Sequence, residues 1–138
     1  MQIKALSCWG VGILFIAAGA NHFASPDSYQ AMMPPLLPWP MALIYISGAA
    51  EILGGAGVLL PRVRRNSGWG LIALLVAVFQ ANIFAAIHGF NGGALERVIL
   101  IARLPFQAVL MAWVYRSCVV GDLRNSHLQP KNSNSKGF

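Results

Sequence analysis

The sequence contains little charge for its length. Only 10% of its 138 residues are charged and 57% are hydrophobic, whereas soluble domains average about 25% charged residues. This shortage excludes an ordinary water-soluble surface, and the short length favours a single domain. The formal net charge is +6, but the basic residues lie between long apolar runs, so no basic face is available for nucleic acid. We therefore expect a lipid bilayer as the main partner, and no nucleic acid.

Cysteine is scarce as well. The two cysteines, Cys8 and Cys118, form no C-x-x-C motif, which argues against a thiol–disulfide catalyst and a cysteine zinc site. His22 and His88 do not combine with Glu51 in any spacing typical of metal ligands, so we expect no metal. No motif for an electron-transfer cofactor is present either. The two cysteines are interpreted as small packing residues, and the cofactor stays unknown.

What the sequence does contain is four long apolar runs. Each is close to the ~20 residues that cross the ~30 Å hydrocarbon core as a helix, and backbone groups inside lipid must pair within their own segment. The predicted fold is an all-α membrane protein, a four-transmembrane-helix bundle in a domain of residues 1–120. Its helices are expected at about residues 4–22, 41–60, 67–88 and 97–117. The polar tail, residues 121–138, is expected to be disordered, and a cleavable signal peptide over the first run is the less favoured alternative.

Lysine and arginine predict the orientation of these helices, because cytoplasmic loops carry an excess of both. In a four-span topology, eight basic residues fall on one side and Arg97 alone lies on the other. The eight are Lys4, Arg62, Arg64, Arg65, Arg116, Arg124, Lys131 and Lys136. We therefore expect an integral protein of a bacterial-type cytoplasmic (inner) membrane with both termini inside. The connection MMPPLLPWP (Met32–Pro40) would then face outward, as an interfacial connector or as a lid.

The second apolar run holds one carboxylate, Glu51, with no Lys, Arg or His within ten residues on either side. At 100° per residue, Glu51 shares its helix face with small residues such as Ser47, Gly48 and Gly55. Small residues mark helix–helix contacts in membranes because they let backbones approach closely. We therefore predict that Glu51 points into the bundle and that Leu53 points toward lipid.

A partner for Glu51 is predicted from depth along the helices. At ~1.5 Å per residue, Glu51 lies ~15 Å below the outer surface and the Cα of Arg103 lies ~9 Å below it. Arg103 also lies on an inward stripe, so a Glu51–Arg103 ion pair is predicted, with Glu96 as the rival partner of Arg103. An unpaired charge would cost roughly 2.5–3.5 kcal/mol by insertion scales. The pair has either a purely structural role, in which it fixes the register of the helices, or also forms part of a site.

More polar side chains fall in the outer half of the bundle than one ion pair needs. A faint internal repeat, ANHF at residues 20–23 and ANIF at residues 81–84, suggests two similar hairpins and favours Asn82 over Gln80 as a cavity-facing residue. We predict a ligand-binding or buried polar cluster there, and no catalytic residue is assigned. The cluster comprises Asn21, His22, Ser47, Glu51, Asn82, Arg103 and Gln107.

The chain resembles the DoxX-like family of small four-helix membrane proteins from Gly12 to about Tyr115. The motifs that carry the resemblance are GANHF, MPPLLPWP, YISGAAEILGG, PRVRR, ANIF and RLPFQ. The resemblance implies a small subunit of the kind associated with thiosulfate:quinone oxidoreduction, while distant animal relatives help to assemble acetylcholine-receptor channels. The bundle is also similar to that of vitamin K epoxide reductase, but this chain lacks that enzyme's C-x-x-C.

Two functions follow as hypotheses. The first is a redox-associated membrane subunit that binds a quinone or a similar small amphipathic ligand, with Phe79, Phe84 and Phe106 walling the ring and a partner subunit supplying the redox chemistry. The alternative is a non-catalytic assembly factor, chaperone-like in action, whose partner is a client membrane protein. Whether the protein is an enzyme, which ligand it takes and whether it forms a homo-oligomer stay open at this point.

Overall fold

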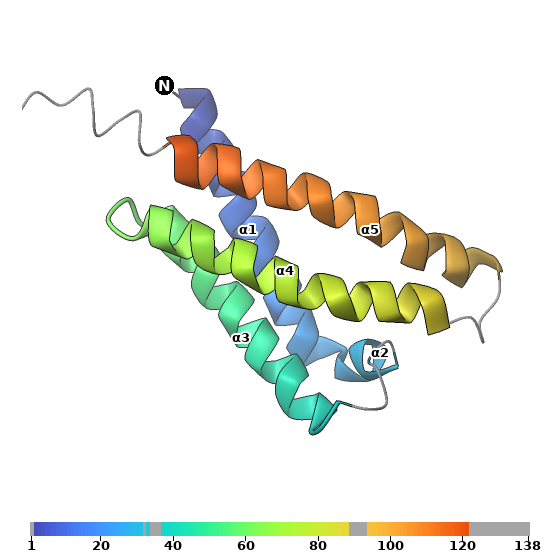
Figure 1. Ribbon diagram of the computed structural model, residues 1–138. Coiled ribbons are helices and arrows are strands. Elements are labelled where there is room, and N and C mark those ends of the chain that lie inside the picture. The colour runs from blue at the N-terminus through green and yellow to red at the C-terminus, as the bar shows by residue number, and fades with distance from the viewer. Residues whose placement is uncertain (1, 32, 34–36, 89–93, 122–138) are drawn as a thin grey trace, which may run out of the picture.

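A computed structural model describes residues 2–31, 33, 37–88 and 94–121, and these residues contain helices and no strand (Figure 1). The described helices are α1 (Gln2–Ala24), α2 (Pro26–Gln30), α3 (Pro40–Leu59), α4 (Arg64–His88), α5 (Ala94–Val114) and the π-helix η1 (Tyr115–Val120). The predicted tail, apart from Gly121, lies outside the described residues.

Three of the described helices, α1, α3 and α4, are long and apolar enough to cross a membrane. Their qualifying stretches are Leu6–Ala24, Pro40–Leu59 and Arg64–Phe84. The helix expected as a fourth span is α5, which is 21 residues long and carries Pro105 in its interior. The apolar runs therefore predicted where the long helices lie, and their observed limits differ from the expected ones by a few residues.

Two elements of the described chain were not predicted. The first is α2, a short helix in the connection between the first two apolar runs; Pro26 occupies its first turn and Asp27 adds an acidic group there. Proline at the first helical position and a carboxylate near the positive end of the helix dipole both favour such a start. The second is η1, where the end of α5 continues as a π-helix.

Glycines let α1 and α3 cross with their backbones in contact. A Cβ atom on Gly19 would lie 2.5 Å from the carbonyl oxygen of Gly48, and one on Gly55 would lie 2.7 Å from that of Gly12. Real side chains do not approach backbone atoms this closely, so the crossing requires glycine at these positions. This is the close approach that small residues permit between membrane helices.

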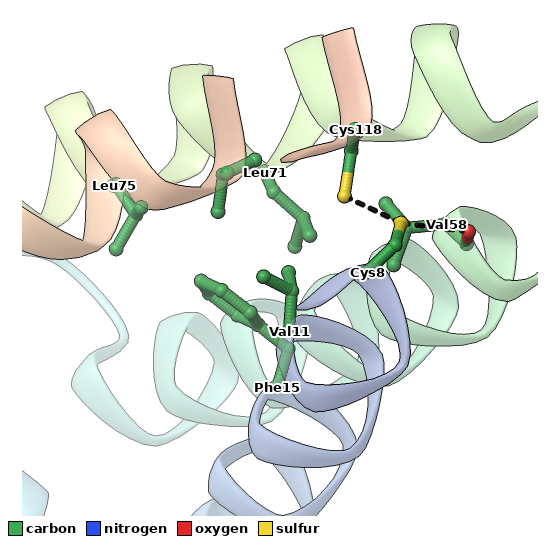
Figure 2. Close-up of a cluster of buried hydrophobic side chains, with 8 residues drawn as sticks. Cys8, Val11, Phe15, Val58, Leu71, Leu75 and Cys118 are labelled. Atoms are coloured by element: carbon green, nitrogen blue, oxygen red, sulfur yellow. Dashed lines mark hydrogen bonds between the residues drawn. The ribbon is translucent and has the colours of Figure 1, made fainter. Parts of the chain in front are cut away.

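One end of the bundle, here called the packed end, has a continuous hydrophobic core (Figure 2). Its buried members come from α1, α3, α4, α5 and η1. They are Cys8, Val11, Phe15, Val58, Leu71, Leu75, Val114 and Cys118. The sulfur atoms of the two cysteines, which are free thiols, lie 2.7 Å apart, and Cys8 Sγ also donates to the carbonyl oxygen of Val58 at 3.3 Å. The interpretation of both cysteines as packing residues agrees with their burial.

Polar contacts join α1 to the end of α5 and to η1 beside this core. The hydroxyl groups of Ser7 and Ser117 lie 2.7 Å apart, and Trp113 Nε1 donates to the Ser7 oxygen at 2.7 Å. From this junction α1 runs away from α5 toward the opposite end of the bundle, where α2 lies (Figure 1). The helices are therefore closely packed at one end, and α1 and α5 separate toward the other, here called the cavity end.

Candidate functional site

A cavity of about 450 Å³ occupies the cavity end of the bundle. Its walls come from α1, α2, α3, α4 and α5 and from the connection between α2 and α3. The lining residues are Ala18, His22, Tyr29, Met33, Leu37, Leu43, Ile44, Ile46, Ser47, Glu51, Leu74, Ala77, Val78, Ala81, Asn82 and Arg103. Most of this wall is apolar, with a few polar side chains, which is the usual composition of a small-molecule site.

Helix α3 presents the face that the sequence predicted. Ile44, Gly48, Glu51 and Gly55 are buried, and Glu51 is only 8% exposed. The opposite face is open, because Leu53 is 72% exposed. The prediction that Glu51 points into the bundle is confirmed. The reason is the helical period, which puts residues three, four and seven positions apart on one face.

His22 is held against α3 through one of its two ring nitrogens. Its Nδ1 lies 3.1 Å from the carbonyl oxygen of Ile44 and 3.0 Å from Ser47 Oγ, and the Ser47 hydroxyl lies 2.9 Å from the same carbonyl oxygen. A carbonyl oxygen can only accept. The network is complete when both Nδ1–H and the Ser47 hydroxyl donate to Ile44, and this arrangement fixes the ring with Nε2 toward Glu51.

Glu51 is the group that His22 Nε2 faces. Nε2 lies 3.8 Å from Glu51 Oε2, and this buried oxygen has no hydrogen-bond partner in the structure. A distance of 3.8 Å is too long for a direct hydrogen bond, which spans about 2.7–3.2 Å. A buried polar atom without a partner is unusual in native proteins and calls for an explanation, such as a bound water, an ion or a catalytic role.

Arg103 lines the same cavity as Glu51. The contact that the structure describes for the Glu51 carboxyl group, however, is with His22. The predicted Glu51–Arg103 pair therefore stays a prediction, and the side chain of its rival, Glu96, lies outside the described residues. Sequence reasoning placed both charges on inward faces, and both side chains line the cavity.

Asn82 and Gln107 form a second polar group beside the cavity. Asn82 Nδ2 donates to Gln107 Oε1 at 2.6 Å, and Gln107 Nε2 donates to the carbonyl oxygen of Leu75. Gln107 is buried and lies behind Asn82, which lines the cavity wall. Gln80 is exposed, so the preference for Asn82 over Gln80 was correct.

Asn21 does not belong to the buried cluster, and the structure corrects this part of the prediction. Its side chain is exposed and donates from Nδ2 to the Tyr29 hydroxyl at 2.9 Å. The two asparagines of the internal repeat are therefore not equivalent. Asn21 lies near the end of α1, where its side chain reaches α2, and Asn82 lies within α4 opposite Gln107.

The predicted aromatic wall is also corrected. Phe106 is 59% exposed, and neither Phe79 nor Phe84 lines the cavity. The aromatic ring in the wall is that of Tyr29, whose centroid lies 4.0 Å from that of His22. Sequence reasoning missed Tyr29 because α2 was not predicted.

The connection between α2 and α3 contributes Met33 and Leu37 to the cavity wall. The apolar character of MMPPLLPWP was the signal for this contact, and it had suggested either a lid or an interfacial connector. Met33 and Leu37 therefore belong to the wall, and the choice between a lid and a connector stays open. Residues 32 and 34–36 lie outside the described part of the chain.

Comparison with known proteins identifies a family without assigning a reaction. Residues 11–118 match the family model described as Domain of unknown function (DUF8561). The chain belongs to this family. No curated protein and no solved structure matches it. The matched region includes the packed core from Val11 onward and the cavity, so the family model covers the whole candidate site.

The chemistry available to this site is hydrogen bonding and apolar contact. Among the described residues, no group of three or more His, Cys, Asp or Glu side chains lies close enough to hold a metal ion. His22 and Glu51 provide proton-accepting or proton-donating atoms at one place in the wall, and Asn82 and Arg103 add polar groups elsewhere in it. The arrangement can hold a largely apolar molecule that also makes hydrogen bonds.

Proposed function

We propose that this protein is a four-span membrane protein of the DoxX-like type that binds a quinone, or a similar small amphipathic ligand, as part of a redox-associated membrane subunit. The observation that carries the proposal is the cavity of about 450 Å³, apolar over most of its wall and polar at His22, Glu51, Asn82 and Arg103. Its volume falls within the ~300–1,000 Å³ typical of ligand sites.

The position of the cavity supports a ligand that arrives through lipid. Three apolar residues of its wall, Leu37, Leu43 and Ile46, are exposed, Ile46 at 64%. In a bilayer such residues contact acyl chains. A molecule dissolved in the hydrocarbon would therefore meet the cavity wall without passing through water.

The orientation proposed for the chain puts the cavity in the outer half of the membrane. The start of α1, the α3–α4 connection and the end of α5 lie at the packed end (Figure 1), and Arg62, Arg64, Arg65 and Arg116 belong to this end. An excess of basic residues marks the cytoplasmic side. The proposed membrane is a bacterial-type cytoplasmic membrane with both termini inside.

Thermal unfolding of the purified protein in lipid nanodiscs tests the binding proposal. A ligand that binds the folded state raises Tm in a concentration-dependent manner, so we expect decylubiquinone, a short-tailed ubiquinone, to raise Tm progressively. An unchanged Tm in the wild-type protein across the titration would count against the proposal and favour the alternative of a non-catalytic assembly factor.

Two leucine substitutions on α4 show whether the cavity is responsible. Ala81 lines the cavity, whereas Ala73 is exposed and does not. Ala81→Leu should fill part of the cavity and abolish the rise in Tm, and Ala73→Leu should leave it intact. An equal rise in both variants would mean that the quinone binds elsewhere.

A further inference from the structure

The facing atoms of His22 and Glu51 suggest which form of the ligand the cavity takes. The Nε2–Oε2 distance of 3.8 Å is too long for a direct hydrogen bond, but one oxygen atom beside the pair, at about 2.8 Å from each, would bridge them, because hydrogen bonds to oxygen span about 2.7–3.0 Å. Glu51 Oε2 has no hydrogen-bond partner of its own in the structure. The geometry therefore suits a single oxygen placed between the two groups.

The groups around His22 indicate where the bridging oxygen comes from. Nδ1 is engaged by Ile44 and Ser47, so Nε2 is the ring nitrogen available to a ligand. The hydroxyl of Tyr29 accepts from Asn21 Nδ2 and is not bonded to Glu51 Oε2, which has no hydrogen-bond partner in the structure. The bridging oxygen must then come from the occupant of the cavity.

A hydroxyl group completes this pair and a carbonyl group does not. When one proton is shared by the pair, it lies either on Glu51 or on Nε2, and the other group is left as an acceptor. A hydroxyl accepts from the protonated group and donates to the other. A carbonyl oxygen can accept from the first, but it then faces the second acceptor with no proton between them, which is costly in a buried site.

We propose that His22 and Glu51 together hold a hydroxyl group of the ligand, so that the cavity favours the hydroquinone over the quinone. The inference rests on the proposed function and makes it more specific. His22 and Glu51 discriminate between the two redox forms, Ser47 positions His22, and the apolar wall binds the ring in either form.

Binding of a matched pair of probes tests the inference. Decylubiquinol and decylubiquinone are titrated anaerobically into the protein in nanodiscs, and Kd is measured by tryptophan fluorescence. We expect the hydroquinone to bind more tightly by about tenfold or more, the factor expected for one hydrogen bond to a buried polar group. Equal Kd values in the wild-type protein would overturn this inference and leave the proposed function standing, whereas no binding of either probe would overturn both.

Variants show whether the pair carries the preference. Glu51→Gln keeps the size of the side chain but supplies an N–H donor that suits a carbonyl, so the ratio of the two Kd values should fall toward one. His22→Asn keeps an amide donor in the place of Nδ1 and removes Nε2, and the ratio should fall in the same way. Val78→Ala, in the apolar wall, should weaken both probes and keep the ratio. A wild-type ratio in both polar variants would overturn the inference.

Discussion

The packed end and the cavity end of the bundle are built from the same long helices and differ in what fills the space between them. At the packed end, Val11, Val58 and Val114 are fully buried against one another's helices. At the cavity end, α1 and α3 remain in contact through Gly19 and Gly48. There α1 has left α5 and leads into α2 (Figure 1), and α1 to α5 all contribute residues to the cavity wall. Side chains fill the space between the helices at the packed end, whereas the cavity remains between them at the cavity end.

The largest effect is expected at the α1–α3 crossing, which both ends share. Gly19→Leu places a side chain where even a Cβ would meet the Gly48 carbonyl oxygen at 2.5 Å, so the two backbones must separate. We expect the loss of the folded protein, measured as aggregation or loss of the monodisperse peak in size-exclusion chromatography. Gly70→Leu is the control, because a Cβ there meets nothing within 4 Å. Normal folding of Gly19→Leu would mean that the helices cross less closely than described.

Two leucines one helical turn apart on α4 compare the packed core with the cavity wall. Leu71 is 1% exposed in the packed core, whereas Leu74 lines the cavity. Leu71→Ala should lower the free energy of unfolding by about 2–5 kcal/mol, because it opens a new cavity. Leu74→Ala should cost about 1 kcal/mol or less, since that side chain already lacks neighbours on one side. Unfolding by sodium dodecyl sulfate measures both, and equal losses would contradict the contrast between the ends.

The two asparagines of the repeat should differ in the same assay. Asn82→Ala leaves the buried Gln107 Oε1 without the donor that it has at 2.6 Å, which costs about 1–3 kcal/mol. Asn21→Ala removes a hydrogen bond at an exposed position and should change the free energy of unfolding by less than about 0.5 kcal/mol. If Asn21→Ala lowered the free energy of unfolding as much as Asn82→Ala, the two asparagines would be equivalent, as the repeat suggested.

The smallest perturbation is a cross-link at the packed end. Cys8 Sγ and Cys118 Sγ lie 2.7 Å apart, so copper–phenanthroline should oxidise the two thiols to one disulfide, with the loss of two hydrogens and without unfolding the protein. Mass spectrometry of a non-reduced digest measures the joined peptides, and Cys118→Ser is the control. If both thiols stay available to a maleimide in denaturant after oxidation, α1 and η1 do not meet as described.

The local sequence pattern was sufficient to predict which way several side chains of the long helices point. The inward orientation of Glu51 and the outward orientation of Leu53 followed from the helical period, and the choice of Asn82 over Gln80 followed from a four-residue repeat. The same reasoning failed for Asn21, because its position at the end of α1 exposes it and brings it to α2. It missed Tyr29, because a five-residue helix leaves no periodic signal.

The sequence by itself determined the long apolar helices, the small face of α3 and the mid-helix depth of Glu51, because each depends on neighbours along one chain segment. The tertiary structure decided which inward groups meet. His22 faces Glu51 at 3.8 Å, although depth and face had favoured Arg103. Depth and helical phase give a height and a direction for each side chain, but the crossing of α1 over α3 through Gly19 and Gly48 sets the distance between them.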